Sequence, residues 1–378
     1  MSLLDRNDIP SPCYVMEEQK LERNLTLMRR VQNESGVRII LALKGFSMWS
    51  TFDLIKPYLQ GATASSVWEA KLAKYEMGGE VHAYSPAYKE SDIEALSSLV
   101  DHLSFNSLSQ WQRFAPQLAS SNVSIGLRVN PENQEADTPL YDPCAPGSRL
   151  GILASQLQGQ DLTGIDGFHV HNLCECDSFA TERTLKAIET KFSPWLHQLK
   201  WLNLGGGHLM TQQGYNVEHL ISTLKTFKEK YPQLDIIMEP GSAVAWDTGP
   251  LIAEVVDIVE NEGQIAILDI SATAHMPDVL EMPYRPRILG AGMPGDKPYN
   301  YRLGGNSCLA GDVLEEYSFD KPLKVGQRIQ FEDMMHYTMV KTSFFNGVEH
   351  PSIAILRKSG DLDVIRQFTY EDFKGRLS

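Results

Sequence analysis

The residue that most needs an explanation is Lys44, which ends the apolar β-type run Ile39-Ile40-Leu41-Ala42-Leu43 just before Gly45. A buried strand rarely ends on a lysine that has no partner. One explanation is that the lysine stem lies along apolar surface while its ammonium reaches water. The other is a desolvated amine whose pKa falls, so that it can form a Schiff base with an aldehyde cofactor. Lys44 is therefore a candidate catalytic residue.

Three later β-type runs also end on residues that could do chemistry: His171, the triplet Gly205-Gly206-Gly207, and Glu239-Pro240-Gly241. Glycines between a strand and a helix let backbone N–H groups approach a phosphate. A glutamate beside an aromatic heterocycle can hold a pyridinium nitrogen protonated, and a histidine ring can stack on a flat cofactor. Each also has a structural explanation, as a turn, a cap or a core histidine. Their joint occurrence favours a binding site.

The elements that would position these residues follow a βα alternation. Eight β-type runs are separated by segments with helical apolar spacing, such as 67–77, which ends at Gly78-Gly79. The runs are 39–44, 61–65, 81–85, 102–106, 124–130, 167–171, 201–204 and 235–239. This pattern predicts a TIM-like (β/α)₈ barrel, in which chemistry lies at the carboxyl ends of the strands. A doubly wound open sheet is the competing arrangement.

The periodicity changes after about Gly249. Strand-like runs follow at 251–259, 265–270, 327–331, 337–341 and 353–356, with few helical windows between them. We therefore expect an α/β barrel over residues 27–249 and a second, all-β domain built from 1–26 and 250–378.

Composition limits the function classes. The chain has 378 residues, 42% hydrophobic residues and a net charge of −14, which argues against nucleic acid or an anionic membrane as partner and is compatible with a cationic small substrate. The opening of the sequence lacks a signal-peptide pattern, so we expect a cytoplasmic protein. Five scattered cysteines predict reduced thiols, and Cys174-Glu175-Cys176 is too closely spaced for a zinc site, so no metal is expected.

The order of these motifs along the chain resembles the alanine-racemase-fold decarboxylases, fold type III enzymes that depend on pyridoxal 5'-phosphate (PLP). The group includes the ornithine, diaminopimelate and biosynthetic arginine enzymes. The resemblance continues through 305–312, 336–338 and 345–347. Segments 148–152, 168–175 and 274–284 are most similar to the carboxynorspermidine (carboxyspermidine) decarboxylases of polyamine synthesis.

The resemblance implies a role for each matched residue. Lys44 would bond to PLP, His171 would stack on the ring, and Glu239 would face the pyridinium nitrogen, which suits decarboxylation. The phosphate would be held by Gly206, Gly207, Gly241 and Tyr337. Cys308 and Asp312 would reach into the site of a second subunit, with Cys308 as proton donor, so the resemblance implies a homodimer with shared active sites.

Substrate preference follows from a departure from the related enzymes. Where diaminopimelate decarboxylases use arginine to hold a distal carboxylate, this chain has Glu281, which would attract an ammonium instead. Asp278, Asp312 and Glu175 can add to this negative field. We therefore expect decarboxylation of carboxynorspermidine or carboxyspermidine to norspermidine or spermidine. The alternatives are a diaminopimelate or other basic amino-acid decarboxylase, and a non-catalytic protein that binds and regulates a decarboxylase.

Overall fold

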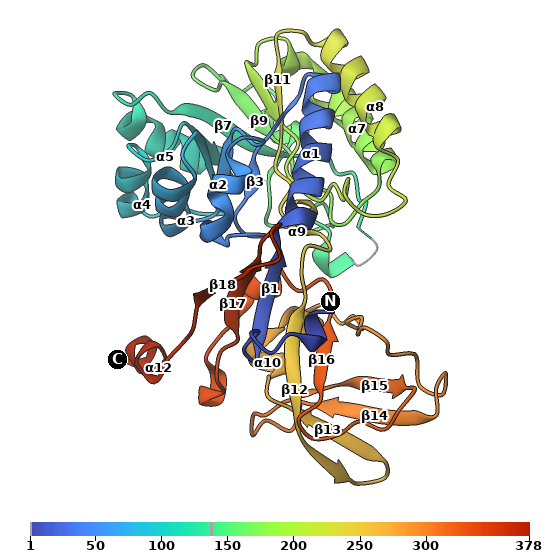
Figure 1. Ribbon diagram of the computed structural model, residues 1–378. Coiled ribbons are helices and arrows are strands. Elements are labelled where there is room, and N and C mark those ends of the chain that lie inside the picture. The colour runs from blue at the N-terminus through green and yellow to red at the C-terminus, as the bar shows by residue number, and fades with distance from the viewer. Residues whose placement is uncertain (1, 137–138) are drawn as a thin grey trace. The chain divides into compact units, whose positions relative to one another are not determined.

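A computed structural model describes residues 2–136 and 139–378 (Figure 1). The chain forms two compact units: Glu22–Val244, and the chain up to Leu21 together with Ala245–Ser378. The domain limits expected from the sequence, at residues 27 and 249, stay predictions.

The first unit is a barrel of parallel strands, as predicted. Its sheet has ten strands in the order β2-β11-β10-β9-β7-β6-β5-β4-β3, with β8 paired to β7. The strands are β2 (Arg38–Ile39), β3 (Leu41–Ala42), β4 (Gly61–Ala64), β5 (Glu80–Tyr84), β6 (His102–Phe105), β7 (Ser124–Asn130), β8 (Ile152–Leu153), β9 (Gly167–His169), β10 (Trp201–Asn203) and β11 (Asp235–Met238). All eight β-type runs of the barrel region therefore coincide with barrel strands.

The barrel closes through the short stretch that contains β2 and β3. β2 pairs with β11 and β3 pairs with β4, and between them the Ile40 N–H donates to the Met238 carbonyl at 3.0 Å. The Trp201 indole fills part of the interior. A Cβ on Gly126 or Gly167 would lie only 2.2 or 2.0 Å from that ring, so these two positions require glycine.

Helices cover the outside of the barrel sheet (Figure 1). They are α1 (Glu18–Ser35), α2 (Phe52–Ile55), α3 (Val67–Leu72), α4 (Glu90–Leu96), α5 (Leu108–Leu118), α6 (Ala154–Leu157), α7 (Ser178–Leu196), α8 (Val217–Lys230) and α9 (Ser242–Ala245). Several begin at a side chain that accepts a backbone N–H, as Ser107 does for α5 and Asp177 for α7. Such caps fix where the chain leaves each loop at the rim of the barrel.

The second unit contains an eight-stranded mixed sheet in the order β15-β14-β13-β12-β1-β17-β18, with β16 paired to β12. Its strands are β1 (Cys13–Glu17), β12 (Leu251–Glu260), β13 (Gln264–Leu268), β14 (Tyr299–Gly304), β15 (Val313–Phe319), β16 (Arg328–Phe331), β17 (Ser352–Leu356) and β18 (Leu362–Arg366). The N-terminal strand β1 lies between β12 and β17, and the apolar side chains of Ile9, Cys13, Val15, Ile252 and Ala354 form a core cluster there.

The sequence suggested that this unit is all β, and the structure differs. It also holds the short helices α10 (Ala272–His275) and α11 (Asp278–Glu281) and the terminal α12 (Tyr370–Leu377). The predicted strand at 337–341 is wrong, because Thr338 is helical and begins a 3₁₀ turn, Met339–Lys341. Its buried hydroxyl donates to Asp278 at 2.9 Å, a tertiary contact that the alternation of side chains could not reveal. Strands β14, β15 and β18 were not predicted.

Two findings concern the molecule as a whole. Among the described residues, none of the helices combines the length and hydropathy that crossing a bilayer requires. All five cysteines are free thiols, as the sequence predicts.

Candidate active site

Lys44 and His171 meet at the carboxyl ends of the barrel strands. The Lys44 Nζ lies 3.3 Å from the His171 Nε2, although the two residues are 127 positions apart in sequence. The His171 Nδ1 accepts a hydrogen bond from the Gly206 N–H at 2.8 Å. In a neutral ring the proton must then be on Nε2, which donates toward Lys44. This tautomer requires a lone pair on the lysine nitrogen.

The charges around the pair favour that neutral amine. Lys44 meets solvent on one side, but protein encloses it on the others, and this burial, with the positive charge of Arg128, lowers its pKa. Burial, together with the positive charges of Lys44 and Arg128, holds the pKa of His171 well below its usual range. The lowered pKa of Lys44 favours the amine form, which is the form that bonds to an aldehyde.

Glu239 is a buried acid at the end of β11. Its Oε1 accepts from the Asn203 Nδ2 at 2.6 Å, and the His169 Nε2 lies 3.6 Å from its Oε2. Burial raises the pKa of Glu239, while hydrogen bonds from Asn203 and Thr63 and the charges of Lys44 and Arg128 oppose the rise. A ligand cation or N–H beside this carboxyl would favour its ionised form.

The glycines identified in the sequence allow two loops to approach closely. A Cβ on Gly206 would lie 2.6 Å from the Glu239 carbonyl oxygen, and one on Gly241 would lie 3.0 Å from the Gly45 Cα. Gly207 has a φ of +88°, a conformation that side-chain-bearing residues rarely adopt. The backbone of these loops thus reaches the Lys44 end of β3 with no side chains intervening.

The barrel residues fit PLP. A lysine amine of lowered pKa, a flat imidazole ring, a buried acid and glycine loops match its aldehyde, pyridine ring, ring nitrogen and phosphate. The structure brings together all the predicted barrel residues of the cofactor site: Lys44, His171, Gly206, Gly207, Glu239 and Gly241. Their individual roles toward the cofactor stay proposals.

Sequence reasoning missed Asn203, Arg128 and His169. Arg128 is 5% exposed, donates to the His171 carbonyl at 2.8 Å, and lies over the Tyr84 ring, 4.5 Å from its centroid. His169 is buried, and neither ring nitrogen has a hydrogen-bond partner among the described residues. Two signals in the sequence could have revealed them. Arg128 interrupts the apolar run 124–130, and Asn203 lies two residues before the glycine triplet.

In the sheet unit, Cys308 lies exposed on the loop between β14 and β15. Its N–H donates to the Asn346 Oδ1 at 2.7 Å, and Asn346 has a positive φ of 59°. The buried Asp312 accepts from the Ser307 Oγ at 2.6 Å and from the Ser307 and Thr273 N–H groups at 3.2 Å each. Asp312 thereby shapes the loop that presents the Cys308 thiol.

The remaining acids predicted to bind substrate differ in their surroundings. Asp278 is buried: its Oδ2 accepts from Tyr284 at 3.1 Å and Thr338 at 2.9 Å, and its Oδ1 has no partner among the described residues. The Glu281 carboxylate is 58% exposed and forms an ion pair with Lys341. Glu175, in the barrel unit, is exposed and has a φ of 53°. Tyr337 directly precedes Thr338.

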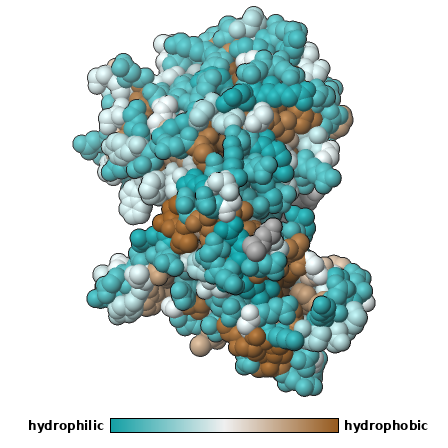
Figure 2. Space-filling model, in the orientation of Figure 1, coloured by the Kyte–Doolittle hydropathy of each residue, from teal (hydrophilic) through white to brown (hydrophobic). Residues whose placement is uncertain are grey.

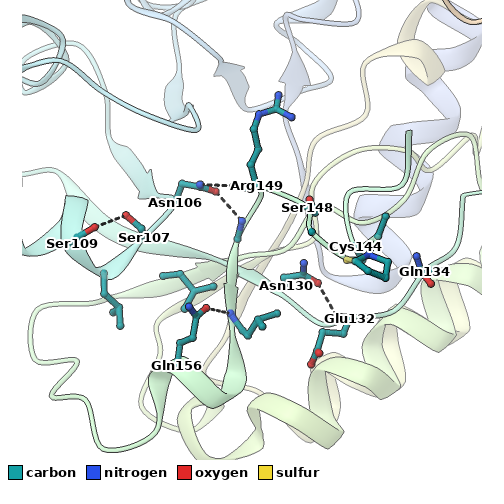
Figure 3. A pocket seen from close by; sticks show the side chains of 17 residues that line it. Asn106, Ser107, Ser109, Asn130, Glu132, Gln134, Cys144, Ser148, Arg149 and Gln156 are labelled. Atoms are coloured by element: carbon teal, nitrogen blue, oxygen red, sulfur yellow. Dashed lines mark hydrogen bonds between the residues drawn. The ribbon is translucent and has the colours of Figure 1, made fainter. Parts of the chain in front are cut away.

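A cavity of about 720 Å³ opens beside the carboxyl ends of β6 and β7 (Figure 3). Amides and hydroxyls line it, among them Asn106, Ser107 and Asn130, and the Arg149 side chain points away from Gln156 at its far side. Its lining includes neither Lys44, His171 nor Glu239. The residues that line this cavity are therefore different from those around Lys44.

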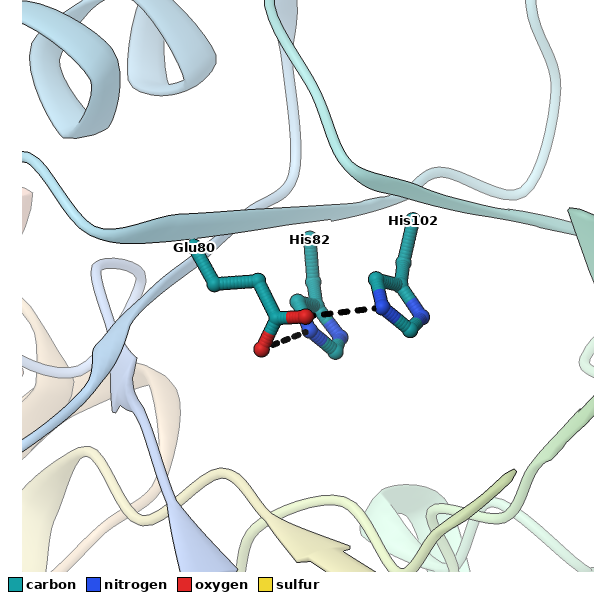
Figure 4. A group of neighbouring side chains, drawn as sticks. All are labelled: Glu80, His82 and His102. Atoms are coloured by element: carbon teal, nitrogen blue, oxygen red, sulfur yellow. Dashed lines mark hydrogen bonds and ion pairs between the residues drawn. The ribbon is translucent and has the colours of Figure 1, made fainter. Parts of the chain in front are cut away.

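Glu80, His82 and His102 form the one group among the described residues with metal-ligand spacing (Figure 4). The two imidazoles are stacked, with centroids 4.1 Å apart and an interplanar angle of 7°, and the Nε2 atoms of both face the Glu80 carboxylate, at 3.4 Å from His82 and 2.9 Å from His102. Arg38 also pairs with Glu80 and Asp235. This geometry is that of a polar network at the amino end of the barrel.

This network predicts acid sensitivity. Burial lowers the pKa of His82 to about 4, although the neighbouring Glu80 carboxylate acts to raise it. The pKa of this histidine in the unfolded chain is 6.5. As pH falls from about 6.5 to 4, the unfolded state binds a proton that the folded state does not, so stability is lost. We expect wild type to lose about 2 kcal/mol more than His82→Gln between pH 7 and pH 5, measured by urea unfolding. The exposed His197→Gln should behave like wild type, and equal losses in His82→Gln and wild type would refute the assignment.

Comparison with known proteins agrees with this geometry. Residues 13–335 match the family model of the pyridoxal-dependent decarboxylases, C-terminal sheet domain. The chain is 52% identical to the carboxyaminopropylagmatine decarboxylase of Synechocystis sp., covering 98% of this chain and 96% of that protein. It is 46% identical to the carboxynorspermidine/carboxyspermidine decarboxylase of Campylobacter jejuni, covering 97% and 98%. A crystal structure of the Campylobacter jejuni carboxynorspermidine decarboxylase with norspermidine superposes with a TM-score of 0.91 at 44% identity, covering 97% of this chain and 100% of that one.

The fold and the comparisons define a fold type III PLP enzyme. The chain belongs to the pyridoxal-dependent decarboxylases. The predicted resemblance, the PLP cofactor and the decarboxylase activity are thereby confirmed, and the interpretation as a non-catalytic regulator is not supported. Diaminopimelate decarboxylases are more distant relatives, such as one from Haemophilus influenzae at 28% identity over 62% of this chain.

Proposed function

We propose that this enzyme decarboxylates carboxynorspermidine and carboxyspermidine, giving norspermidine and spermidine in polyamine biosynthesis. These substrates have an amino-acid end, an internal secondary amine and a terminal ammonium. Full-length relatives that act on carboxylated polyamines support the proposal. The structural observation that carries it is the buried Asp278, whose Oδ1 has no protein partner among the described residues.

Such an oxygen is costly unless a ligand satisfies it. Of the four acids predicted to face the substrate, Asp312 accepts hydrogen bonds from Ser307 in its own loop and from Thr273 in α10. Glu281 is paired with Lys341, and Glu175 is exposed. Asp278 is therefore the preferred partner for a substrate ammonium, and the other three acids add to the negative field around it.

PLP supplies an electron sink for the bond that breaks when the carboxylate leaves as carbon dioxide. Lys44 would bond to the cofactor aldehyde, His171 would lie against the ring, and Glu239 would hold the ring nitrogen protonated. Gly206, Gly207, Gly241 and Tyr337 would hold the phosphate. Cys308 would then give a proton to the substrate α-carbon.

We further propose that the enzyme is a homodimer in which Cys308 and Asp312 of one subunit complete the site of the other. Exposed apolar side chains around Cys308 support this proposal, because a partner subunit could cover them. Leu309 and Val313 follow Cys308 in the sequence, Phe345 precedes its hydrogen-bond partner Asn346, and each of the three is more than two-fifths exposed. Apolar groups also reach the surface elsewhere on the visible face (Figure 2). A location in the cytoplasm, and the expectation that the enzyme binds neither nucleic acid nor membrane, stay predictions from the sequence.

A second substrate deserves equal testing, because the chain is 52% identical to a carboxyaminopropylagmatine decarboxylase. Agmatine ends in a guanidinium, which can form two parallel hydrogen bonds with a carboxylate, whereas an ammonium is a compact point charge. Asp278 already accepts from two hydroxyls on Oδ2, so Oδ1 alone has no partner among the described residues, and a single acceptor oxygen favours the ammonium.

The test is carbon dioxide release from a substrate panel. We expect the highest kcat/KM with the two carboxy-triamines, and little release from meso-diaminopimelate, ornithine, lysine or arginine. Preference for carboxyaminopropylagmatine would establish the second candidate instead. Preference for meso-diaminopimelate would refute both.

Asp278→Asn tests the ammonium contact. Loss of a buried carboxylate that faces a cation costs about 2–5 kcal/mol. We therefore expect KM for carboxynorspermidine to rise on the order of 30-fold or more, with a smaller change in kcat. Glu281→Gln is the matched comparison and should raise KM less, because that carboxylate is exposed and paired. If Glu281→Gln has the larger effect, the assignment moves to Glu281.

A further inference from the structure

A chain of hydrogen bonds joins the groups proposed to hold the cofactor, and Asn203 is its central link. The Asn203 Nδ2 donates to the Glu239 Oε1 at 2.6 Å, and its Oδ1 accepts from the Gly205 N–H at 2.8 Å. The next residue, Gly206, donates its N–H to the His171 Nδ1 at 2.8 Å, and that ring contacts Lys44. The Glu239 N–H in turn donates a hydrogen bond to the Gly205 carbonyl at 2.7 Å.

The orientation of the Asn203 amide follows from its partners. The Gly205 N–H can only donate, so it must face the amide oxygen, and the amide nitrogen must therefore face Glu239. Asn203 is 2% exposed and lies at the end of β10, which is paired on both sides in the sheet. The amide cannot turn away without leaving two buried polar groups unpaired.

The other groups near Glu239 are less well placed to fix its orientation. His169, from β9, approaches Oε2 only to 3.6 Å, and burial holds the pKa of its ring well below the usual range. Lys44, after β3, and Arg128, on β7, act on Glu239 through their charges, and Thr63 on β4 offers its hydroxyl. Asn203 is the group with a short, directed hydrogen bond.

We infer that Asn203 is a positioning residue that holds Glu239 ionised and aimed, and couples it to the glycine loop and His171, so that the cofactor ring nitrogen is kept protonated during decarboxylation. The inference rests on the proposed role of Glu239. A donor-only group on Oε1 stabilises the carboxylate without competing for a proton.

Asn203→Asp separates this role from a purely structural one. The introduced aspartate can still accept from Gly205, but its second oxygen meets the Glu239 Oε1, and two carboxylates this close share one proton. We expect kcat of the PLP-loaded enzyme at pH 7 to fall on the order of tenfold or more, with KM changed less than about threefold. The rate should recover at alkaline pH as the shared proton is lost. The pH titration of the bound PLP absorbance, measured without substrate, should shift in parallel.

Three other variants make the test decisive. Asn203→Ala should also lower kcat, but without alkaline recovery, since no proton is shared. Asn24→Ala removes another buried amide, which donates to the Val244 carbonyl at 3.2 Å, and should reduce stability alone. Glu239→Gln reports on the underlying assignment: if it leaves kcat and the absorbance titration unchanged, the role of Glu239 is wrong and the inference falls with it.

If Glu239→Gln is impaired but Asn203→Asp keeps kcat within twofold of wild type and a wild-type pH profile, the inference alone is overturned. Should Asn203→Asp fail to fold, Asn203→Ala decides. Wild-type kcat in the loaded Asn203→Ala enzyme, with only thermal stability reduced, would show that Asn203 is merely structural.

Discussion

Replacing Lys44 with alanine is expected to lower decarboxylation below about one thousandth of the wild-type rate and to abolish the visible absorbance of covalently bound PLP. Among the described barrel residues, Lys44 is the amine that lies beside the His171 ring, and its lowered pKa favours the amine form that the bond needs. Absorbance spectroscopy after incubation with PLP and gel filtration measures the bond directly.

Two controls sharpen this prediction. Lys71→Ala removes an exposed lysine from α3 and should leave both the band and the rate unchanged. Lys44→Arg keeps a cation but provides no amine of low pKa, so it should be as inactive as Lys44→Ala. A visible band that survives in Lys44→Ala would show that another lysine bonds to the cofactor.

The second large effect concerns the shared site. Homodimers of Lys44→Ala and of Cys308→Ala should each be inactive, because every site lacks one residue. In a mixed dimer, the barrel of the Cys308→Ala subunit keeps Lys44 and receives an intact Cys308 from its partner. With about half the dimers mixed and one good site in each, activity should return to at most about a quarter of wild type.

Subunit exchange has to be verified independently, for example by co-purifying two differently tagged variants. No recovery in verified mixed dimers would mean that each site uses its own Cys308. A useful companion measurement is PLP binding by Cys308→Ala, which should stay close to wild type because the thiol acts after the cofactor is bound. Loss of the cofactor from this variant would make the role of Cys308 structural.

The barrel could be predicted from the sequence because its information is local. Apart from β8, its strands lie in short apolar runs bounded by glycine or polar residues, and each run predicts burial without any knowledge of its neighbours. Lys44, His171, the glycine triplet and Glu239 were found for the same reason, since each interrupts such a run at its end. Strand ends of a parallel barrel share one rim, so their proximity followed from the fold class.

Only the tertiary structure decided which side chains touch. The Lys44 to His171 contact and the Asn203 to Glu239 bond join residues 127 and 36 positions apart, and no local pattern encodes such pairs. The strand predicted at 337–341 was wrong because Thr338 satisfies a buried carboxylate, Asp278, from a distant part of the chain. In the sequence, Asp278 only added to the negative field, and Glu281 was the leading candidate to face the substrate ammonium. Burial separates them, because one has an unpartnered oxygen within the described structure and the other lies exposed in an ion pair.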